Sequence, residues 1–137
     1  MLRFRHGNLF DHRGHIGHCV SQDLSMHRGI AKEFKKRFGG ISELREQTGQ
    51  VGDVRWIHRD GRYILYIITK DRFFHKPTYP KIEEGLVNLR SFLEMKGIHS
   101  IGIPRICCGK DRKNWNDVRA LIEKVFKGAK ICVIVYV

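Results

Sequence analysis

The sequence predicts an α/β domain in which a central mixed β-sheet is covered by helices on both faces. Three observations support this fold class. Strand-like and helix-like segments alternate along the chain. An Asp-Gly pair between two apolar runs indicates a β-hairpin, and the continuous apolar run 131–136 is typical of a strand buried on both faces. Since 137 residues suit one compact core, we expect residues 1–137 to form a single domain.

Strands are expected where short apolar runs are bounded by turn residues. In chain order they are 2–5, 16–21, 54–57, 63–69, 100–103 and 131–136. The third and fourth strands flank Arg59-Asp60-Gly61-Arg62, so they should pair as an antiparallel hairpin.

Helices are expected where apolar residues recur every three or four positions. The first, 29–38, is ended by Gly39-Gly40, and 41–47 is expected to be a short second helix. Pro80 suits the first turn of the next helix, and Asn114 can cap the last one. The apolar stripes are Ile30, Phe34 and Phe38; Ile82, Leu86, Leu89 and Leu93; and Trp115, Val118, Ile122 and Val125.

Three loops should meet at the ligand-binding edge of the sheet, because ligands in such folds bind beyond the carboxyl ends of the strands. These loops are 21–29, 70–78 and 105–114. Backbone N–H groups of the third can face a diphosphate, and Gly109 permits a close approach. Taken alone, however, this loop is an ordinary connection. Lys70 at a strand end and Asp111 in a turn do not by themselves indicate catalysis either.

The charge balance points to anionic partners. The chain has 26 Lys and Arg against 14 Asp and Glu, a formal net charge of +12, which attracts phosphates, nucleic acid or acidic proteins. We find no obvious pair of exposed aromatic residues for base stacking. No apolar stretch approaches the length of a membrane helix, and the first residues do not resemble a signal peptide. We expect a monomer, in the nucleus or cytoplasm, that does not bind membranes.

Neither the cysteines nor the histidines predict a metal site. The cysteines at 19, 107, 108 and 132 form no C-x-x-C pair, and Cys19 and Cys132 are expected to be small buried residues. Nothing requires a disulfide, in agreement with a reducing compartment. His12, His15 and His18 are regularly spaced, but the intervening glycines disfavour a helix that would bring them to one side.

Several segments together resemble one known family, the terminal ADP-ribose protein glycohydrolases, which are small macro domains. They are 7–10 (GNLF), 18–21 (HCVS), 29–31 (GIA), 34–40 (FKKRFGG), 59–63 (RDGRY), 68–70 (ITK), 75–79 (HKPTY) and 104–112 (PRICCGKDR), followed by Trp115 and Val135-Tyr136. The resemblance covers nearly the whole chain in one order. It implies a three-layer α/β/α macro domain with a central mixed β-sheet of six or seven strands and an ADP-ribose cleft.

The resemblance also implies a mechanism. The lysine nucleophile of the family matches Lys70, and its catalytic aspartate matches Asp111. The lysine would attack C1″ of ADP-ribose esterified to a Glu or Asp side chain, and the aspartate would move protons. Related chemistry would deacylate O-acyl-ADP-ribose. The mechanism needs no cofactor or metal. The expected substrate-binding residues are Asn8, Leu9, Ser21, Arg28, Gly29, Ile30, Arg105, Ile106, Cys107, Cys108, Gly109, Lys110 and Tyr136.

Four positions depart from the family pattern. Asn8 stands where the family has an acidic residue that accepts from the adenine amino group, and His27, Arg28 and Cys107 replace small residues. The last three add bulk, which either tightens phosphate binding through Arg28 or narrows the cleft. Three functions therefore stay open: a glycohydrolase acting on mono-ADP-ribosylated proteins, a reader of ADP-ribose or poly(ADP-ribose) without turnover, and a basic nucleic-acid-binding domain.

Overall fold

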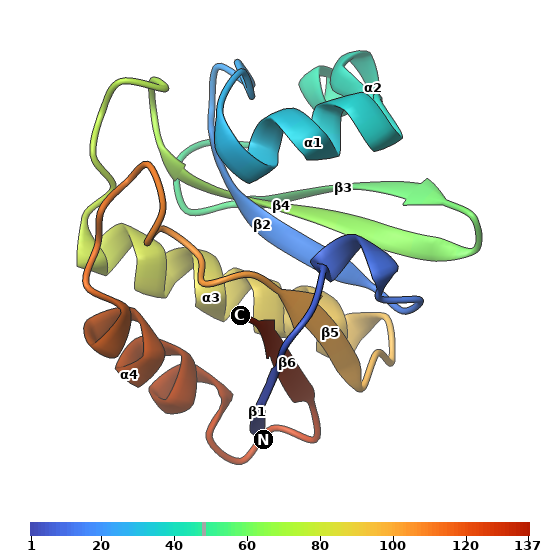
Figure 1. Ribbon diagram of the computed structural model, residues 1–137, viewed down its shortest axis with the longest axis vertical. Helices are drawn as coiled ribbons and strands as arrows, with labels where there is room; N and C mark the ends of the chain where they lie inside the picture. Colours follow the sequence, from blue (N-terminus) through green and yellow to red (C-terminus); the bar gives the residue numbers. More distant parts are fainter. Residues whose placement is uncertain (48) are drawn as a thin grey trace.

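The computed structural model describes residues 1–47 and 49–137 and contains a six-stranded mixed sheet (Figure 1). The strand order is β1-β6-β5-β2-β4-β3, and every neighbouring pair is parallel except the β3–β4 hairpin. The strands are β1 (Leu2–Arg5), β2 (Ile16–Ser21), β3 (Val54–Arg59), β4 (Arg62–Lys70), β5 (Ser100–Ile103) and β6 (Cys132–Tyr136). The predicted mixed sheet and hairpin are confirmed.

Helices cover both faces of this sheet (Figure 1). On one face lie α1 (Gly29–Phe38) and α2 (Ile41–Glu46), and on the other α3 (Tyr79–Met95) and α4 (Trp115–Phe126). A short 3-10 helix, η1 (Leu9–Asp11), follows β1. The apolar stripes predicted for α3 and α4 pack into a core with β4, β5 and β6, and Phe34 of α1 enters a second core with β2 and β4.

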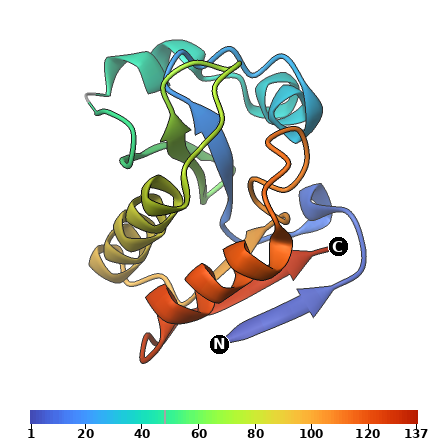
Figure 2. The ribbon, with the colours of Figure 1, turned by 90° about the vertical axis from the view of Figure 1, so that its left-hand side faces the viewer.

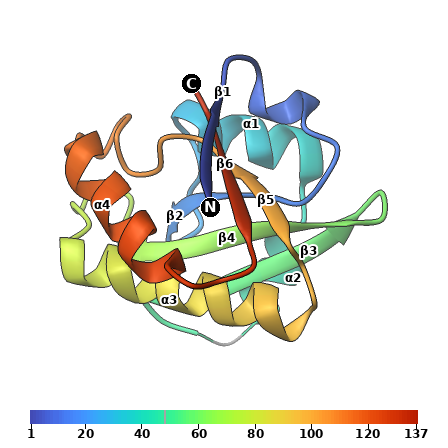
Figure 3. The same cartoon turned by 90° about the horizontal axis from the view of Figure 1, so that it is seen from below.

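The sequence misplaced some element ends by one or two residues. In the hairpin, pairing continues up to Arg59 opposite Arg62, so both strands reach the two-residue turn Asp60-Gly61. β6 begins at Cys132, where its pairing with Ser100 of β5 starts, and Ile131 lies outside it. β6 lies between β5 and the N-terminal β1, as Figure 3 shows from below. The expectation of a buried inner strand is therefore confirmed.

The β2–β5 boundary is where the sheet opens. These two strands pair through Ile16 and Gly102 near their starts, and no further register pair joins them in this described part of the chain. The chain leaves β2 toward α1 on one face and leaves β5 toward α4 on the other. Neighbouring strands whose connections diverge in this way leave a crevice at their carboxyl ends, where ligands bind in α/β folds.

Within the described residues, no helix is long and apolar enough to cross a lipid bilayer.

Candidate active site

A cavity of about 800 Å³ opens at the carboxyl ends of β2, β4 and β5. Figure 2 shows the three predicted loops gathering at this end of the molecule. The cavity is lined by His18, Cys19, Val20, Ser21, Met26, His27, Arg28, Gly29, Ile30, Ala31, Lys70, Phe73, Lys76, Pro104, Arg105, Ile106, Cys107, Gly109, Lys110, Asp111 and Arg112. Its volume is in the range of sites for cofactor-sized ligands, so the added bulk of His27, Arg28 and Cys107 does not fill it.

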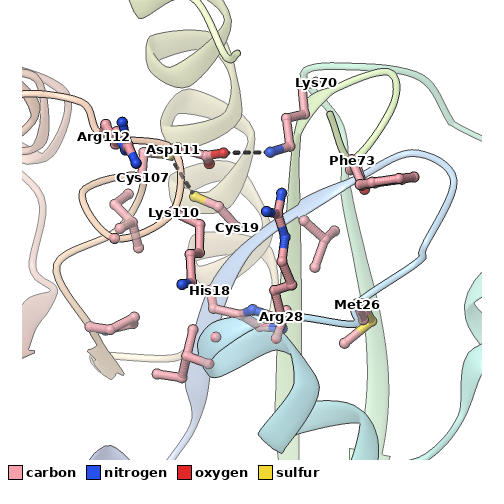
Figure 4. A pocket seen from close by; sticks show the side chains of 18 of the residues that line it. His18, Cys19, Met26, Arg28, Lys70, Phe73, Cys107, Lys110, Asp111 and Arg112 are labelled. Atoms are coloured by element: carbon pink, nitrogen blue, oxygen red, sulfur yellow. Dashed lines mark hydrogen bonds and ion pairs between the residues drawn. The ribbon is translucent and has the colours of Figure 1, made fainter. Parts of the chain in front are cut away.

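Lys70 and Asp111 form an ion pair inside this cavity, between Lys70 Nζ and Asp111 Oδ1. Figure 4 shows the two side chains pointing toward each other, one from the end of β4 and the other from the loop after β5. The side chains are 13% and 15% exposed, so the pair is reached through the cavity. The structure thus brings together two residues whose individual sequence contexts were uninformative.

A β-bulge contributes to the placement of Lys70. Val20 of β2 pairs with Ile68 of β4, but the next residue, Ser21, pairs with Lys70, so Thr69 is skipped. Because side chains alternate between the faces of a strand, such a shift re-aims the residues beyond it. The backbone N–H of Gln22 then donates to the Lys70 carbonyl at 2.8 Å, which joins the ends of the two strands.

Asp23 joins two of the cavity loops. Its carboxylate accepts from the Ser21 hydroxyl at 2.5 Å, from the Ser25 amide at 3.1 Å and from the Phe73 amide at 2.9 Å. Burial by itself would raise the pKa of Asp23, but these hydrogen bonds and the charge of Arg72 together hold it below its usual value. The ionised carboxylate therefore ties loop 21–29 to loop 70–78.

The start of α1 faces the cavity. Gly29, Ile30 and Ala31 line it, and the N-cap residue Arg28 makes no side-chain capping hydrogen bond. The first N–H groups of a helix attract anions. The start of α4, which follows the loop 105–114, is arranged differently. The side chain of Asn114 caps α4 by accepting from the Asp117 amide, and the first residues of α4 are absent from the cavity lining.

Backbone strain is concentrated in the cavity loops. Among the described non-glycine residues, five have a positive φ, and four of them lie in loops 21–29 and 105–114: Leu24, Met26, Cys107 and Arg112. Cys107, with φ +63°, stands where the family pattern has glycine, and this conformation gives the physical reason for that glycine. Strain of this kind is typical of functional sites held by the surrounding fold.

Most of the predicted binding residues line the cavity, and four do not. The lining includes Ser21, Arg28, Gly29, Ile30, Arg105, Ile106, Cys107, Gly109 and Lys110. Leu9 is buried in the core, and Cys108 is half-buried beside the cavity residues. Asn8 caps η1 by accepting from the Phe10 amide at 2.9 Å, and the Tyr136 hydroxyl contacts His12 Nδ1 at 2.7 Å. The substrate-binding roles predicted for Asn8, Leu9, Cys108 and Tyr136 stay predictions.

One feature was missed by the sequence interpretation. Phe73 and Phe74 are both exposed, at 38% and 65%, and their rings lie edge to face with centroids 5.3 Å apart. Phe73 lines the cavity and packs on His27. The conclusion that the chain has no exposed aromatic pair was therefore wrong. Paired phenylalanines in a sequence usually indicate core, and only the loop position of these two could have suggested otherwise.

The three regularly spaced histidines lie in separate environments. His12 contacts Tyr136, His15 accepts from the Tyr63 amide at 3.0 Å, and His18 is fully buried with its ring stacked on Phe34. Within residues 1–47 and 49–137, no group of three His, Cys, Asp or Glu side chains is arranged to hold a metal ion. Cys19 and Cys132, expected to be buried, are half-buried, Cys19 because it faces the cavity.

The cavity is strongly basic. Among its described lining residues, six are Lys or Arg and one, Asp111, is acidic. Figure 4 shows the Arg28 guanidinium extending from the start of α1 toward Lys70 and Asp111. A basic cavity with a helix N-terminus on its wall suits a ligand that carries phosphate groups.

Comparison with known proteins agrees with this geometry. The chain is 46% identical over 121 residues to the human ADP-ribose glycohydrolase OARD1, covering 88% of this chain and 80% of that protein, and 46% identical over 119 residues to the bovine protein of the same name. No protein-family model matches the chain.

Solved structures show the same fold. The macrodomain of Thermus aquaticus DarG superimposes with a TM-score of 0.88 at 26% identity, covering 100% of this chain and 98% of that one. Thermosipho africanus DarTG, solved in complex with ADP-ribose, superimposes with a TM-score of 0.83 at 19% identity over 98% of this chain and 41% of that one. This protein has the macrodomain fold and, by its identity to OARD1 over most of both chains, belongs to the ADP-ribose glycohydrolase family.

Proposed function

We propose that this chain hydrolyses the ester bond between C1″ of ADP-ribose and the carboxylate of a Glu or Asp side chain, and thereby removes ADP-ribose from mono-ADP-ribosylated proteins. The observation that carries the proposal is the Lys70–Asp111 ion pair inside a basic cavity. The relatives named ADP-ribose glycohydrolase support it through their 46% identity. The ester of O-acyl-ADP-ribose is the corresponding small-molecule substrate.

The wall of the cavity offers two groups of donors for the diphosphate. The first is the start of α1 with Arg28, and the second is the loop 105–111 with Lys110. Placed between them, the diphosphate directs the distal ribose toward Lys70 and Asp111, because these residues lie in the same cavity. The binding energy of the phosphates then holds C1″ beside the reactive amine.

The ion pair supplies the reacting groups. Asp111 accepts a proton from the Lys70 ammonium through their direct contact, which leaves a neutral amine. Its lone pair attacks C1″, the C1″–O bond breaks, and the Glu or Asp side chain leaves as a carboxylate. Water then attacks C1″ of the lysyl adduct, the C1″–N bond breaks, and ADP-ribose is released with loss of one water proton to the solvent. Asp111 returns its proton to the freed Lys70 amine. Every step uses groups of this chain and water.

The exposed pair Phe73 and Phe74 lies where the protein that carries the ADP-ribose would contact this chain. Phe73 and Phe74, together with Arg72 and Lys76, give the rim an apolar and basic character. Such a surface suits an acidic segment around the modified residue. Together with the net charge of +12, it also favours nucleic acid as a second partner, because bases stack on exposed aromatic rings.

The experiment uses a peptide that carries ADP-ribose on one glutamate. We expect free ADP-ribose to accumulate, as measured by liquid chromatography. A peptide with ADP-ribose on serine is the matched control: its linkage is an acetal, and an alkoxide is a poorer leaving group than a carboxylate, so it should react far more slowly. A single-stranded oligonucleotide added as competitor tests the second partner. If ADP-ribose binds but neither peptide is cleaved, the chain is a reader.

Removal of the Arg28 guanidinium is expected to weaken ADP-ribose binding. Arg28→Ala should raise the Kd about tenfold, because a charge-assisted hydrogen bond to phosphate contributes on the order of 1.5–3 kcal/mol, part of which water replaces. Calorimetry at two salt concentrations should show a smaller difference at high salt. Arg45→Ala, at an exposed arginine of α2, is the matched control and should bind as wild type does. Unchanged affinity in Arg28→Ala would assign this arginine to the solvated surface.

A further inference from the structure

Two cysteines from different elements meet on the cavity wall. Cys19 lies in β2, Cys107 lies in the loop after β5, and Cys107 Sγ donates a hydrogen bond to Cys19 Sγ across 3.2 Å. Figure 4 shows both side chains in the cavity close to Asp111. Both residues line the cavity, Cys19 half-buried and Cys107 buried, so an oxidant would approach the two thiols from the cavity side.

The geometry needs only a small change to join them. A disulfide bond is about 2.05 Å long, so the sulfur atoms must approach by about 1 Å. Cys19 lies in a strand that is paired with β4 along its whole length, whereas Cys107 lies in a loop and has a strained, left-handed backbone. The loop is therefore the part that moves.

We propose that Cys19 and Cys107 are a redox modification site, where a hydroperoxide or a small-molecule disulfide converts the two thiols to a reversible disulfide that cross-links β2 to the loop 105–114. This crosslink is independent of hydrolysis and forms whether or not the chain turns over a substrate.

The reaction balances with the oxidant as the electron acceptor. One thiolate attacks a peroxide oxygen, the O–O bond breaks, and the sulfur becomes a sulfenic acid while one water is released. The second thiol attacks this sulfur, the S–O bond breaks, and the hydroxyl leaves as a second water. Two thiols and one hydrogen peroxide thus give one disulfide and two waters. With a small-molecule disulfide, two exchange steps give the crosslink and two small thiols.

The surroundings predict a slow reaction at neutral pH. The hydrogen bond with Cys107, burial, and the nearby Cys107, Asp111 and Cys108 groups all raise the pKa of the Cys19 thiol. Burial raises the pKa of the neighbouring Cys108 to about 11. Since thiolates are the attacking species, the crosslink should form faster as the pH rises.

The crosslink is expected to disturb catalysis. Asp111 lies in the same loop as Cys107, and the Lys113 amide donates to the Cys107 carbonyl at 2.9 Å, so a movement of Cys107 is transmitted along the loop. Reacting groups that are misplaced by about 1 Å can lose up to about 10²-fold in rate. We therefore expect the oxidised protein to release ADP-ribose about tenfold more slowly, and dithiothreitol to restore the rate.

The test begins with the reduced chain of 137 residues, treated with hydrogen peroxide and, separately, with glutathione disulfide. Free thiols are then blocked with N-ethylmaleimide. The crosslinked chain should lose the mass of two hydrogen atoms and take up the label at two cysteines instead of four. A tryptic map should join peptide 14–28, which holds Cys19, to peptide 106–110.

Two variants identify which cysteine is bonded to Cys19, because peptide 106–110 contains both Cys107 and Cys108. Cys108→Ser should still form the crosslink, and Cys107→Gly should not, while glycine accepts the left-handed backbone at that position. The rate of Cys107→Gly, relative to its own reduced form, should not respond to the oxidant. A bond from Cys19 to Cys108, a bond between Cys107 and Cys108, or four labelled thiols after oxidation would each overturn the proposal.

Discussion

Replacement of Lys70 by alanine is expected to abolish the release of ADP-ribose while ADP-ribose still binds. Lys70 supplies the amine that attacks C1″ in the proposed mechanism, whereas we expect the phosphates to be held by the start of α1 and the loop 105–111, which line the same cavity. Loss of a nucleophile costs on the order of 10³-fold or more in kcat. Single-turnover assays with the glutamate-linked peptide measure the rate, and calorimetry measures the affinity.

Two further lysine variants separate the nucleophile from its charge. Lys70→Arg keeps a cation opposite Asp111 but offers no comparable nucleophile, so it should be as inactive as Lys70→Ala. Lys76→Ala removes another cavity lysine that does not contact Asp111, and it should weaken binding while turnover continues. A Lys70→Arg protein with nearly wild-type kcat would mean that the lysine acts only as a charge.

The aspartate has a different expected phenotype. Asp111→Ala keeps the Lys70 side chain but removes the group that takes its proton before attack and returns it during release, so both steps should slow. An adduct on Lys70, once formed, should then persist, and intact-mass spectrometry should show a chain heavier by one ADP-ribosyl group. The double variant with Lys70→Ala should show no added mass. An adduct that appears equally in this double variant would lie on another residue.

Replacement of His18 by phenylalanine is expected to stabilise the fold, most strongly in acid. The His18 ring is 0% exposed and stacks on Phe34 with centroids 3.7 Å apart, and neither ring nitrogen has a hydrogen-bond partner among the described residues. Burial lowers the pKa of His18 to about 3. An unpaired buried polar group costs about 1–3 kcal/mol, so an aromatic ring without nitrogens should raise the free energy of unfolding even at neutral pH.

The pH dependence of stability follows from the difference in the pKa of His18 between the folded and the unfolded state. In the unfolded chain the ring has a pKa near 6.5, so it binds a proton as the pH falls below that value, while the folded state stays neutral down to about 3. Protonation of His18 therefore has no effect on the free energy of unfolding above about pH 6.5. As the pH falls from 6.5 toward 3, the free energy of unfolding decreases, because the unfolded state binds the proton first. At pH 5 the loss amounts to about 2 kcal/mol.

Urea denaturation at pH 7.5 and pH 5 measures this difference. His12 and His15, whose pKa values burial also lowers, contribute in the same direction, so the wild type and His18→Phe must be compared at each pH. Between pH 7.5 and pH 5, the free energy of unfolding of His18→Phe should fall by about 2 kcal/mol less than that of the wild type. His6→Phe, at an exposed histidine, is the control and should follow the wild type. If the free energy of unfolding fell equally in all three proteins, His18 would have the same pKa in the folded and the unfolded state.

The sequence by itself determined most secondary elements, because their signals are local. The four-residue spacing of Ile30, Phe34 and Phe38 predicted α1, and Asn114 predicted the start of α4 through its cap. Asp60-Gly61 predicted the hairpin turn. Element ends were less certain, because a strand ends where its partner stops pairing, and the partner is distant in sequence.

Only the tertiary structure decided the contents of the site. Lys70 and Asp111 are 41 residues apart, and they meet because a bulge re-aims the end of β4 while the loop after β5 turns back over the same cavity. Cys19 and Cys107 are 88 residues apart and likewise meet only there. Spacing along a chain carries no record of such contacts. They depend on which strands become neighbours and how their ends diverge, and packing of the whole core decides both.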